Sequence, residues 1–143
     1  MKFLLTNDDG IKAPGLAMLA QALSGLGKVV VVAPTAPLSG CSHQVSTLRP
    51  LQVTEIAAGW HAVDGMPADC IRLGLLHLAL DADWVMAGIN DGGNLGVDVY
   101  MSGTVAAVRE AAMFGKPGIA FSQYRRTREP AAWSATVPMV KRV

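Results

Sequence analysis

The sequence predicts an α/β fold in which helices cover both faces of a mostly parallel sheet. Short apolar runs closed by turn residues alternate along the chain with longer amphipathic segments, as strands and crossover helices do in β-α-β units. The apolar runs are almost wholly hydrophobic, which is typical of strands buried on both faces. Because parallel strands need crossover connections, the two observations predict one doubly wound sheet.

The chain begins with a predicted β-α-β unit. Residues 2–6 and 28–33 are apolar runs that end at turn residues, and we predict buried strands there. Residues 14–26 lie between them and favour a helix, because Pro14 suits a first turn and glycines lie near the end.

The middle of the chain predicts a hairpin, a second helix and a third buried strand. Residues 51–56 and 60–63 are predicted to pair across a short turn that contains glycine. Residues 67–80 favour a helix, because Asp69 in its first turn suits the positive end of the helix dipole. Residues 83–88 are again apolar and predict a strand.

A long Gly-rich loop over 89–102 is predicted to lead into a helix over 104–115 and a buried strand over 117–122. The complete alternation predicts a Rossmann-like three-layer sandwich. The predicted core covers residues 1–123. Residues 124–143 are expected to form a charged loop and a partial helix, because Pro138 interrupts the helical pattern.

Composition limits the kinds of partner and location. The 143 residues are 51% hydrophobic and 16% charged, enough for one core. A net charge of +1 gives no broad basic surface for a nucleic-acid polymer, so a small molecule is the expected partner. Two cysteines make a disulfide framework or a structural zinc site improbable. With no signal peptide and no membrane span expected, the prediction is a soluble cytoplasmic protein.

Adjacent carboxylates follow the first predicted strand. Ligands of doubly wound sheets bind outside the carboxyl ends of the strands, and Asp8 and Asp9 lie there. Two neighbouring carboxylates repel each other unless a cation neutralises them, and oxygen ligands suit Mg²⁺ or Mn²⁺. A helix cap in an Asp-Gly turn is the alternative.

Three further polar segments are predicted at the same edge of the sheet. Ser39 lies in a Ser/Gly/Pro loop that suits a metal or a phosphate, or is a plain loop. Asn90 and Asn94 lie among glycines whose amides can approach an anion, although a bare turn explains them equally well and the spacing of nucleotide-binding fingerprints is absent. Residues 102–104 begin a helix, where they can bind phosphate or act as an ordinary cap.

Several separated blocks of the sequence resemble the SurE family of survival proteins, 5'/3'-nucleotidases also described as acid phosphatases and exopolyphosphatases. The resemblance runs from Met1 to about Ser122. The blocks are Thr6-Asn7-Asp8-Asp9-Gly10-Ile11, Val32-Ala33-Pro34, Pro67-Ala68-Asp69-Cys70, Gly88-Ile89-Asn90, Gly93-Asn94 with Gly96, and Ser102-Gly103-Thr104-Val105-Ala106-Ala107.

The resemblance implies a metal-dependent phosphomonoesterase that hydrolyses nucleoside 5'- or 3'-monophosphates, with Asp8 and Asp9 as catalytic residues. Family members are longer than this chain, so the resemblance implies that residues 124–143 begin a truncated C-terminal part. Family members are expected to form homodimers or homotetramers, and they carry a charged stretch where this chain has Ala36-Pro37-Leu38. The implied metal ligands are Asp8, Asp9, Ser39 and Asn90, and the implied substrate-binding residues are Asn94, Ser102, Gly103 and Thr104.

Two other interpretations stay open from the residues. A phospho-signalling receiver-like domain has an acidic pair after its first strand and would use Asp91 as phosphate acceptor. The order of elements argues against it, because Lys116-Pro117 precedes the last predicted strand instead of following it. An inactive fragment would keep the metal site and act as a binding or assembly module. His43, close to Ser39, suits a general acid for the leaving alcohol, although a histidine in a polar loop is more often solvated.

Overall fold

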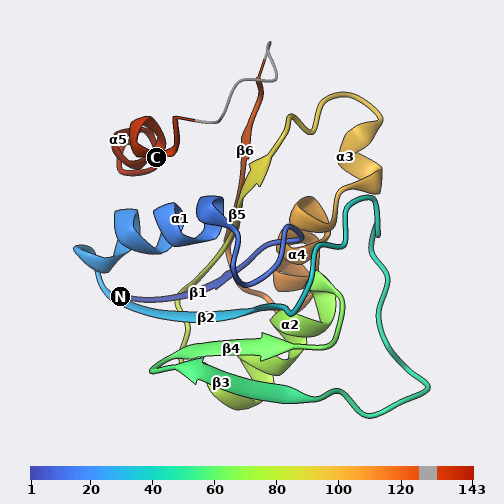
Figure 1. The fold of residues 1–143 in the computed structure, drawn as a ribbon. Helices are drawn as coiled ribbons and strands as arrows, with labels where there is room; N and C mark the ends of the chain where they lie inside the picture. Colours follow the sequence, from blue (N-terminus) through green and yellow to red (C-terminus); the bar gives the residue numbers. More distant parts are fainter. Residues whose placement is uncertain (126–131) are drawn as a thin grey trace.

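A computed structural model describes residues 1–125 and 132–143 and contains a six-stranded sheet with helices on both faces (Figure 1). The strand order is β3-β4-β2-β1-β5-β6, and every pair is parallel except the β3–β4 hairpin. The strands are β1 (Lys2–Thr6), β2 (Lys28–Pro34), β3 (Val53–Ala57), β4 (Trp60–Val63), β5 (Trp84–Asp91) and β6 (Gly118–Gln123). The helices are α1 (Pro14–Ser24), α2 (Pro67–Leu73), the π-helical turn η1 (Gly74–Leu78), α3 (Asp98–Met101), α4 (Gly103–Met113), the 3₁₀ turn η2 (Trp133–Ala135) and α5 (Thr136–Val140).

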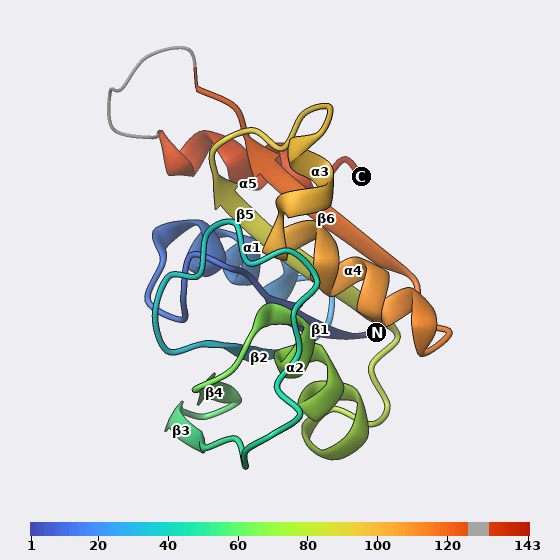
Figure 2. The same cartoon turned by 90° about the vertical axis from the view of Figure 1, so that its right-hand side faces the viewer.

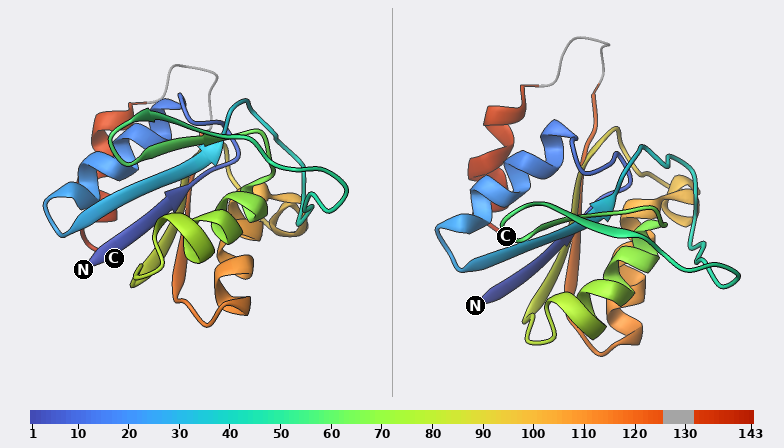
Figure 3. Two further views of the ribbon diagram at one scale, coloured as in Figure 1. Left: turned by 90° about the horizontal axis from the view of Figure 1, so that it is seen from below. Right: turned by 60° about the horizontal axis from the view of Figure 1, so that its bottom comes forward.

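The two faces of the sheet carry separate cores. Phe3 and Leu5 of β1 pack with α1, whereas Leu4 points to the opposite face and packs with α2 and α4. Figure 3 shows α1 and α5 together on one side of the sheet and α2 and α4 on the other. The three-layer, mostly parallel arrangement predicted from the apolar runs is confirmed, since a central strand covered on both faces has no polar side.

Some boundaries differ from the prediction. β5 continues to Asp91, beyond the predicted strand over 83–88, because Asn90 and Asp91 pair with residues of β6. The region predicted as one loop contains the short helix α3. The helix predicted over 67–80 is α-helical only to Leu73, and the N–H of Ala79 then donates to the carbonyl of Gly74 at 2.7 Å, which makes a wider π turn.

The last described segment packs onto the α1 face of the sheet. Val140 of α5 is buried in the same core as Leu16 and Leu19 of α1. Pro138 falls in the first turn of α5, where a missing N–H removes no helical hydrogen bond. The predicted partial helix is therefore present over 136–140. Its predicted start at Ala131 lies outside the described residues.

No membrane-spanning helix is present in residues 1–125 and 132–143, where every helix is too short or too polar for one.

Candidate functional site

A polar cleft of about 310 Å³ opens where the carboxyl ends of β1 and β5 meet. The sheet order changes direction between these two strands, since β1 pairs with β2 on one side and with β5 on the other. Ligands of doubly wound sheets bind at this topological switch point. The cleft is lined by Asp8, Asp9, Ser39, Gly40, Asn90, Asp91, Gly92, Gly93, Asn94, Asp98, Met101 and Ser102.

Asp8 is fixed at the base of the cleft by the first turn of α4. Asp8 is only 3% exposed. One carboxylate oxygen accepts the N–H groups of Gly103 at 3.1 Å and Thr104 at 3.2 Å, and the other accepts the Thr104 hydroxyl at 2.6 Å. The positive end of the α4 dipole favours this carboxylate. Gly103 and Thr104, predicted to bind substrate, therefore hold Asp8, and neither is among the residues that line the cleft.

Asp9 lies beside Asp8 and faces the cleft. One of its carboxylate oxygens accepts the N–H of Asp91 at 2.9 Å, which connects β1 to the end of β5. The pKa of Asp9 lies above its usual value, because burial and the charges of Asp8 and Asp91 raise it. The hydrogen bond from the Asp91 N–H lowers this pKa but does not cancel the shift. The three carboxylates thus create a negative field that a bound cation would relieve.

The end of β5 and the loop after it supply amide groups. The Asn90 side-chain nitrogen donates to the Gly92 carbonyl at 2.9 Å, and that of Asn94 donates to the Ser122 hydroxyl at 2.7 Å. In this arrangement the side-chain oxygen of Asn90 remains to act as a ligand. The Asp91 carboxylate forms an ion pair with Arg125 at the rim. Arg126 and Arg128 of the predicted charged loop lie outside the described residues.

The loop after β2 approaches the cleft from the other side. The N–H of Leu38 donates to the Asp8 carbonyl at 2.7 Å, so that Ser39 and Gly40 reach the lining. Gly10 allows this close approach: its φ is +94°, and a Cβ there would lie 3.1 Å from the Ala36 carbonyl carbon.

Ser102 has both of the properties that the sequence left open. Its hydroxyl oxygen accepts the N–H of Val105 at 3.1 Å and so caps α4. The same residue lines the cleft, although it is only 4% exposed. The hydroxyl hydrogen remains available for a ligand, because the cap uses only the oxygen.

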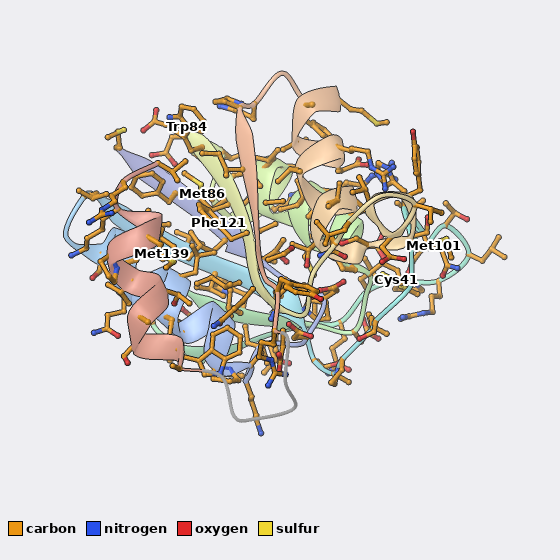
Figure 4. The ribbon with its side chains drawn as sticks, turned by 90° about the horizontal axis from the view of Figure 1, so that it is seen from above. Cys41, Trp84, Met86, Met101, Phe121 and Met139 are labelled. Carbon is orange, nitrogen blue, oxygen red and sulfur yellow. The ribbon has the colours of Figure 1, made fainter. Side chains whose placement is uncertain are left out.

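Cys41 and His43 follow Gly40 in the loop after β2 but are not among the residues that line the cleft. Figure 4 shows Cys41 next to Met101, and a Cβ built on Gly103 would lie 2.6 Å from the Cys41 sulfur. Burial and the nearby charge of Asp8 raise the pKa of the Cys41 thiol, which disfavours a nucleophilic thiolate. His43 is not a solvated loop residue, since its Nε2 lies 2.7 Å from a carboxylate oxygen of Glu110.

The oxygen ligands gathered here fit a hard divalent cation. Within the described residues, no group of three or more His, Cys, Asp or Glu side chains is arranged as a metal site. The candidate set instead combines the Asp8 and Asp9 carboxylates with the Asn90 amide oxygen and the Ser39 hydroxyl. Mg²⁺ commonly uses one or two carboxylates and keeps several waters, so this set suits Mg²⁺ or Mn²⁺.

A doubly wound sheet with an acidic, oxygen-rich cleft at its switch point is typical of α/β proteins whose ligand site lies outside the carboxyl ends of the strands. The sequence profile of the family described as "Survival protein SurE" matches residues 3–143, and the chain belongs to this family. The membership confirms the resemblance seen in the sequence blocks and leaves the receiver-like interpretation without support.

The similar proteins are nucleotidases by name. The chain is 51% identical to "5'-nucleotidase SurE" of Geobacter sulfurreducens over 85% of this chain and 47% of that protein. It is 45% identical to the protein of the same name from Syntrophotalea carbinolica over 94% of this chain and 58% of that protein. The crystal structure of SurE protein from Aquifex aeolicus superposes with a TM-score of 0.89 at 41% identity, covering 99% of this chain and 59% of that one.

The chain thus spans about half the length of the curated relatives that it matches, from 47% to 58% in these two.

Proposed function

We propose that this chain is a metal-dependent phosphomonoesterase that hydrolyses nucleoside 5'- or 3'-monophosphates to nucleoside and phosphate. The observation that carries the proposal is the position of Asp8 and Asp9 at the switch-point cleft, with Ser39 and Asn90 on its lining. The names of the similar proteins, 5'-nucleotidase SurE, support the choice of substrate class.

We assign the metal to Asp8, Asp9, Ser39 and Asn90. A bound Mg²⁺ or Mn²⁺ would neutralise phosphate charge and lower the pKa of a water molecule. Asp8 is suited to hold its place in this set, because hydrogen bonds from Gly103 and Thr104 fix both of its oxygens.

The two aspartates differ in what their carboxylates can still accept. Both residues line the cleft, but the Asp8 carboxylate accepts from three donors, whereas the Asp9 carboxylate accepts the Asp91 N–H. Asp9 therefore keeps acceptor capacity for a water molecule. We assign to Asp9 the orientation and deprotonation of the water that attacks phosphorus.

We assign the binding of the phosphoryl group to Asn94 and Ser102. Both line the cleft, and the Ser102 hydroxyl can donate while its oxygen caps α4. Fixed donors of this kind stabilise the charge on phosphate oxygens during displacement. Gly103 and Thr104 act behind them by holding Asp8, and their direct contact with substrate stays a prediction.

Phosphate release from adenosine monophosphate by the purified chain tests the proposal. We expect turnover with Mn²⁺ or Mg²⁺, none with chelator, and loss in Asp9→Asn. Asp64→Asn is the matched control, since Asp64 lies on the surface and bonds to Arg49. Turnover that survives both chelation and Asp9→Asn would contradict the proposal.

A chain half the length of its relatives can also bind metal without turnover. Mn²⁺ binding without phosphate release would identify a binding or assembly module that keeps the site. The assay therefore separates the enzyme from the inactive fragment.

A further inference from the structure

The buried carboxylate of Glu110 connects α4 to α2 and to the loop after β2. Glu110 has a side chain only 2% exposed; one oxygen accepts from Nε of Arg72 on α2 at 2.6 Å, and the other lies 2.7 Å from Nε2 of His43. Burial alone raises the pKa of Glu110, but the bonds and charges of Arg72 and His43 outweigh it and the pKa lies below the usual value. A buried charge needs such partners, because an unpaired carboxylate is costly to desolvate.

His43 belongs to the same loop as Ser39, and contacts of His43 and its neighbour hold that loop against α3 and α4. The preceding residue, Ser42, donates its N–H to the Met101 carbonyl at 2.9 Å and its hydroxyl to the Tyr100 carbonyl at 2.8 Å. Ser42 has a φ of +53°, a conformation that a non-glycine residue keeps only where its surroundings hold it. Figure 2 shows the segment after β2 running past α3 and α4.

The helix that anchors His43 also holds Asp8. Gly103 and Thr104 at the start of α4 bind the Asp8 carboxylate, and Glu110 lies about two turns, or roughly 10 Å, further along the same helix. Asp8 and the Ser39 loop therefore reach the cleft from different strands but are attached to one rigid element.

We infer that Glu110 is a positioning residue for the proposed metal site: by holding His43 it fixes the loop that carries Ser39 relative to Asp8. The inference rests on the proposed function, because it assigns a role toward the same ligands. Neither Glu110 nor His43 is among the residues that line the cleft, so they act on the site through the loop and α4.

Mn²⁺ affinity, measured by calorimetry below the unfolding temperature of each variant, tests the inference together with metal-free thermal unfolding. We expect His43→Ala to weaken Mn²⁺ binding about 10- to 100-fold, the range found when a group that orients a ligand is lost. His43→Gln should restore most of the affinity, since its amide can still donate to Glu110. Glu110→Gln should weaken binding like His43→Ala, because it removes the charge that holds the loop.

Hydrogen exchange gives a readout that needs no metal. The Ser42 N–H, bonded to Met101, should exchange faster in His43→Ala while the amides of β1 keep their protection. Asp81→Ala is the control, since it breaks an ion pair with Lys2 that involves neither the loop nor α4. It should leave both readouts unchanged.

The outcomes separate the two claims. If His43→Ala changes neither the Mn²⁺ affinity nor the exchange of the Ser42 N–H, the contact between His43 and Glu110 has only a structural role. This result would overturn the inference alone, whether or not the unfolding temperature falls. Failure of the unsubstituted chain to bind Mn²⁺ would overturn the proposed function, and the metal-site role of Glu110 with it.

Discussion

The cleft at the carboxyl ends of β1 and β5 and the groove between β6 and α5 are both open, but they are built in opposite ways. The cleft is lined by carboxylates, amides, hydroxyls and glycines. The apolar groove, of about 370 Å³, is lined by Ile89, Phe121, Ser122, Gln123, Tyr124, Ala135, Thr136, Met139, Val140 and Val143. Figure 4 shows Phe121 and Met86 on the side of the sheet that faces α5, with Cys41 and Met101 far from them.

The difference lies in what holds the side chains. In the cleft, hydrogen bonds from distant parts of the chain fix the carboxylates, as Thr104 fixes Asp8 and Asp91 fixes Asp9. In the groove, Phe121 packs against the core, whereas Met139 is 66% exposed. Crowded carboxylates cost stability, so substitutions in the cleft should change function, whereas substitutions in the groove should change stability alone.

The largest expected effect is on catalysis at Asp8. Asp8→Asn keeps the shape of the side chain but removes its charge, and we expect kcat/KM for adenosine monophosphate to fall by about 100-fold or more. Thermal unfolding should show that the variant remains folded. A variant with normal turnover would place the chemistry away from the first turn of α4.

A methyl group at Gly103 should damage both the fold and the site. A Cβ there would lie 2.6 Å from the Cys41 sulfur and 2.9 Å from the Asp8 Cβ, closer than such atoms approach. We expect Gly103→Ala to lower the free energy of unfolding by about 1 to 3 kcal/mol and to weaken Mn²⁺ binding. Gly25→Ala is the matched control, because nothing lies within 4 Å of its Cβ position. Equal stability of the two variants would contradict the close packing of Asp8 against α4.

Phe121 tests the other side of the comparison. It packs against the core beneath the apolar groove, so Phe121→Ser should lower the free energy of unfolding by roughly 1 to 2 kcal/mol through lost apolar burial. Mn²⁺ affinity should not change. Met139→Ser, at a residue 66% exposed, should alter stability by less than about 0.5 kcal/mol. A loss of metal affinity in Phe121→Ser would remove the division between the two regions.

The sequence predicted the fold and much of the cleft for one reason. Parallel strands bring the residues after their carboxyl ends to one edge, so Asp8, Asp9, Ser39 and Asn90 meet there as expected. Apolar periodicity was enough to locate the strands, but it did not show that β5 continues to Asp91, because this end is polar and is held by pairing with β6.

The hydrogen bonds that hold the cleft residues in place could not be predicted in this way. The bond between Thr104 and Asp8 joins residues 96 positions apart, and that between His43 and Glu110 joins residues 67 apart. Side-chain pairs at such separations leave no period in the sequence. A signal did exist for Glu110, a carboxylate that follows Arg109 within an alanine-rich helix, yet its partners become visible only when α2 and the loop after β2 are placed beside α4.

The smallest expected effect concerns the stability of the metal-free cleft. Burial raises the pKa of Asp9 above its ordinary value of 3.8, with the charges of Asp8 and Asp91 adding to the shift. In the pH range between the unfolded and the folded pKa, the folded chain keeps a proton that the unfolded chain has lost. Stability therefore falls as pH rises through this range and stays lower above it.

Asp9→Asn removes this dependence and should raise the metal-free unfolding temperature at neutral pH, because its oxygen can still accept the Asp91 N–H. Well below pH 3.8 the variant and the unsubstituted chain should unfold at similar temperatures. Added Mn²⁺ should reverse the order at neutral pH, since only the unsubstituted chain has the full ligand set and gains stability by binding. A lower metal-free unfolding temperature in Asp9→Asn at neutral pH would mean that the carboxylate cluster stabilises the fold, and the contrast between cleft and groove would fail.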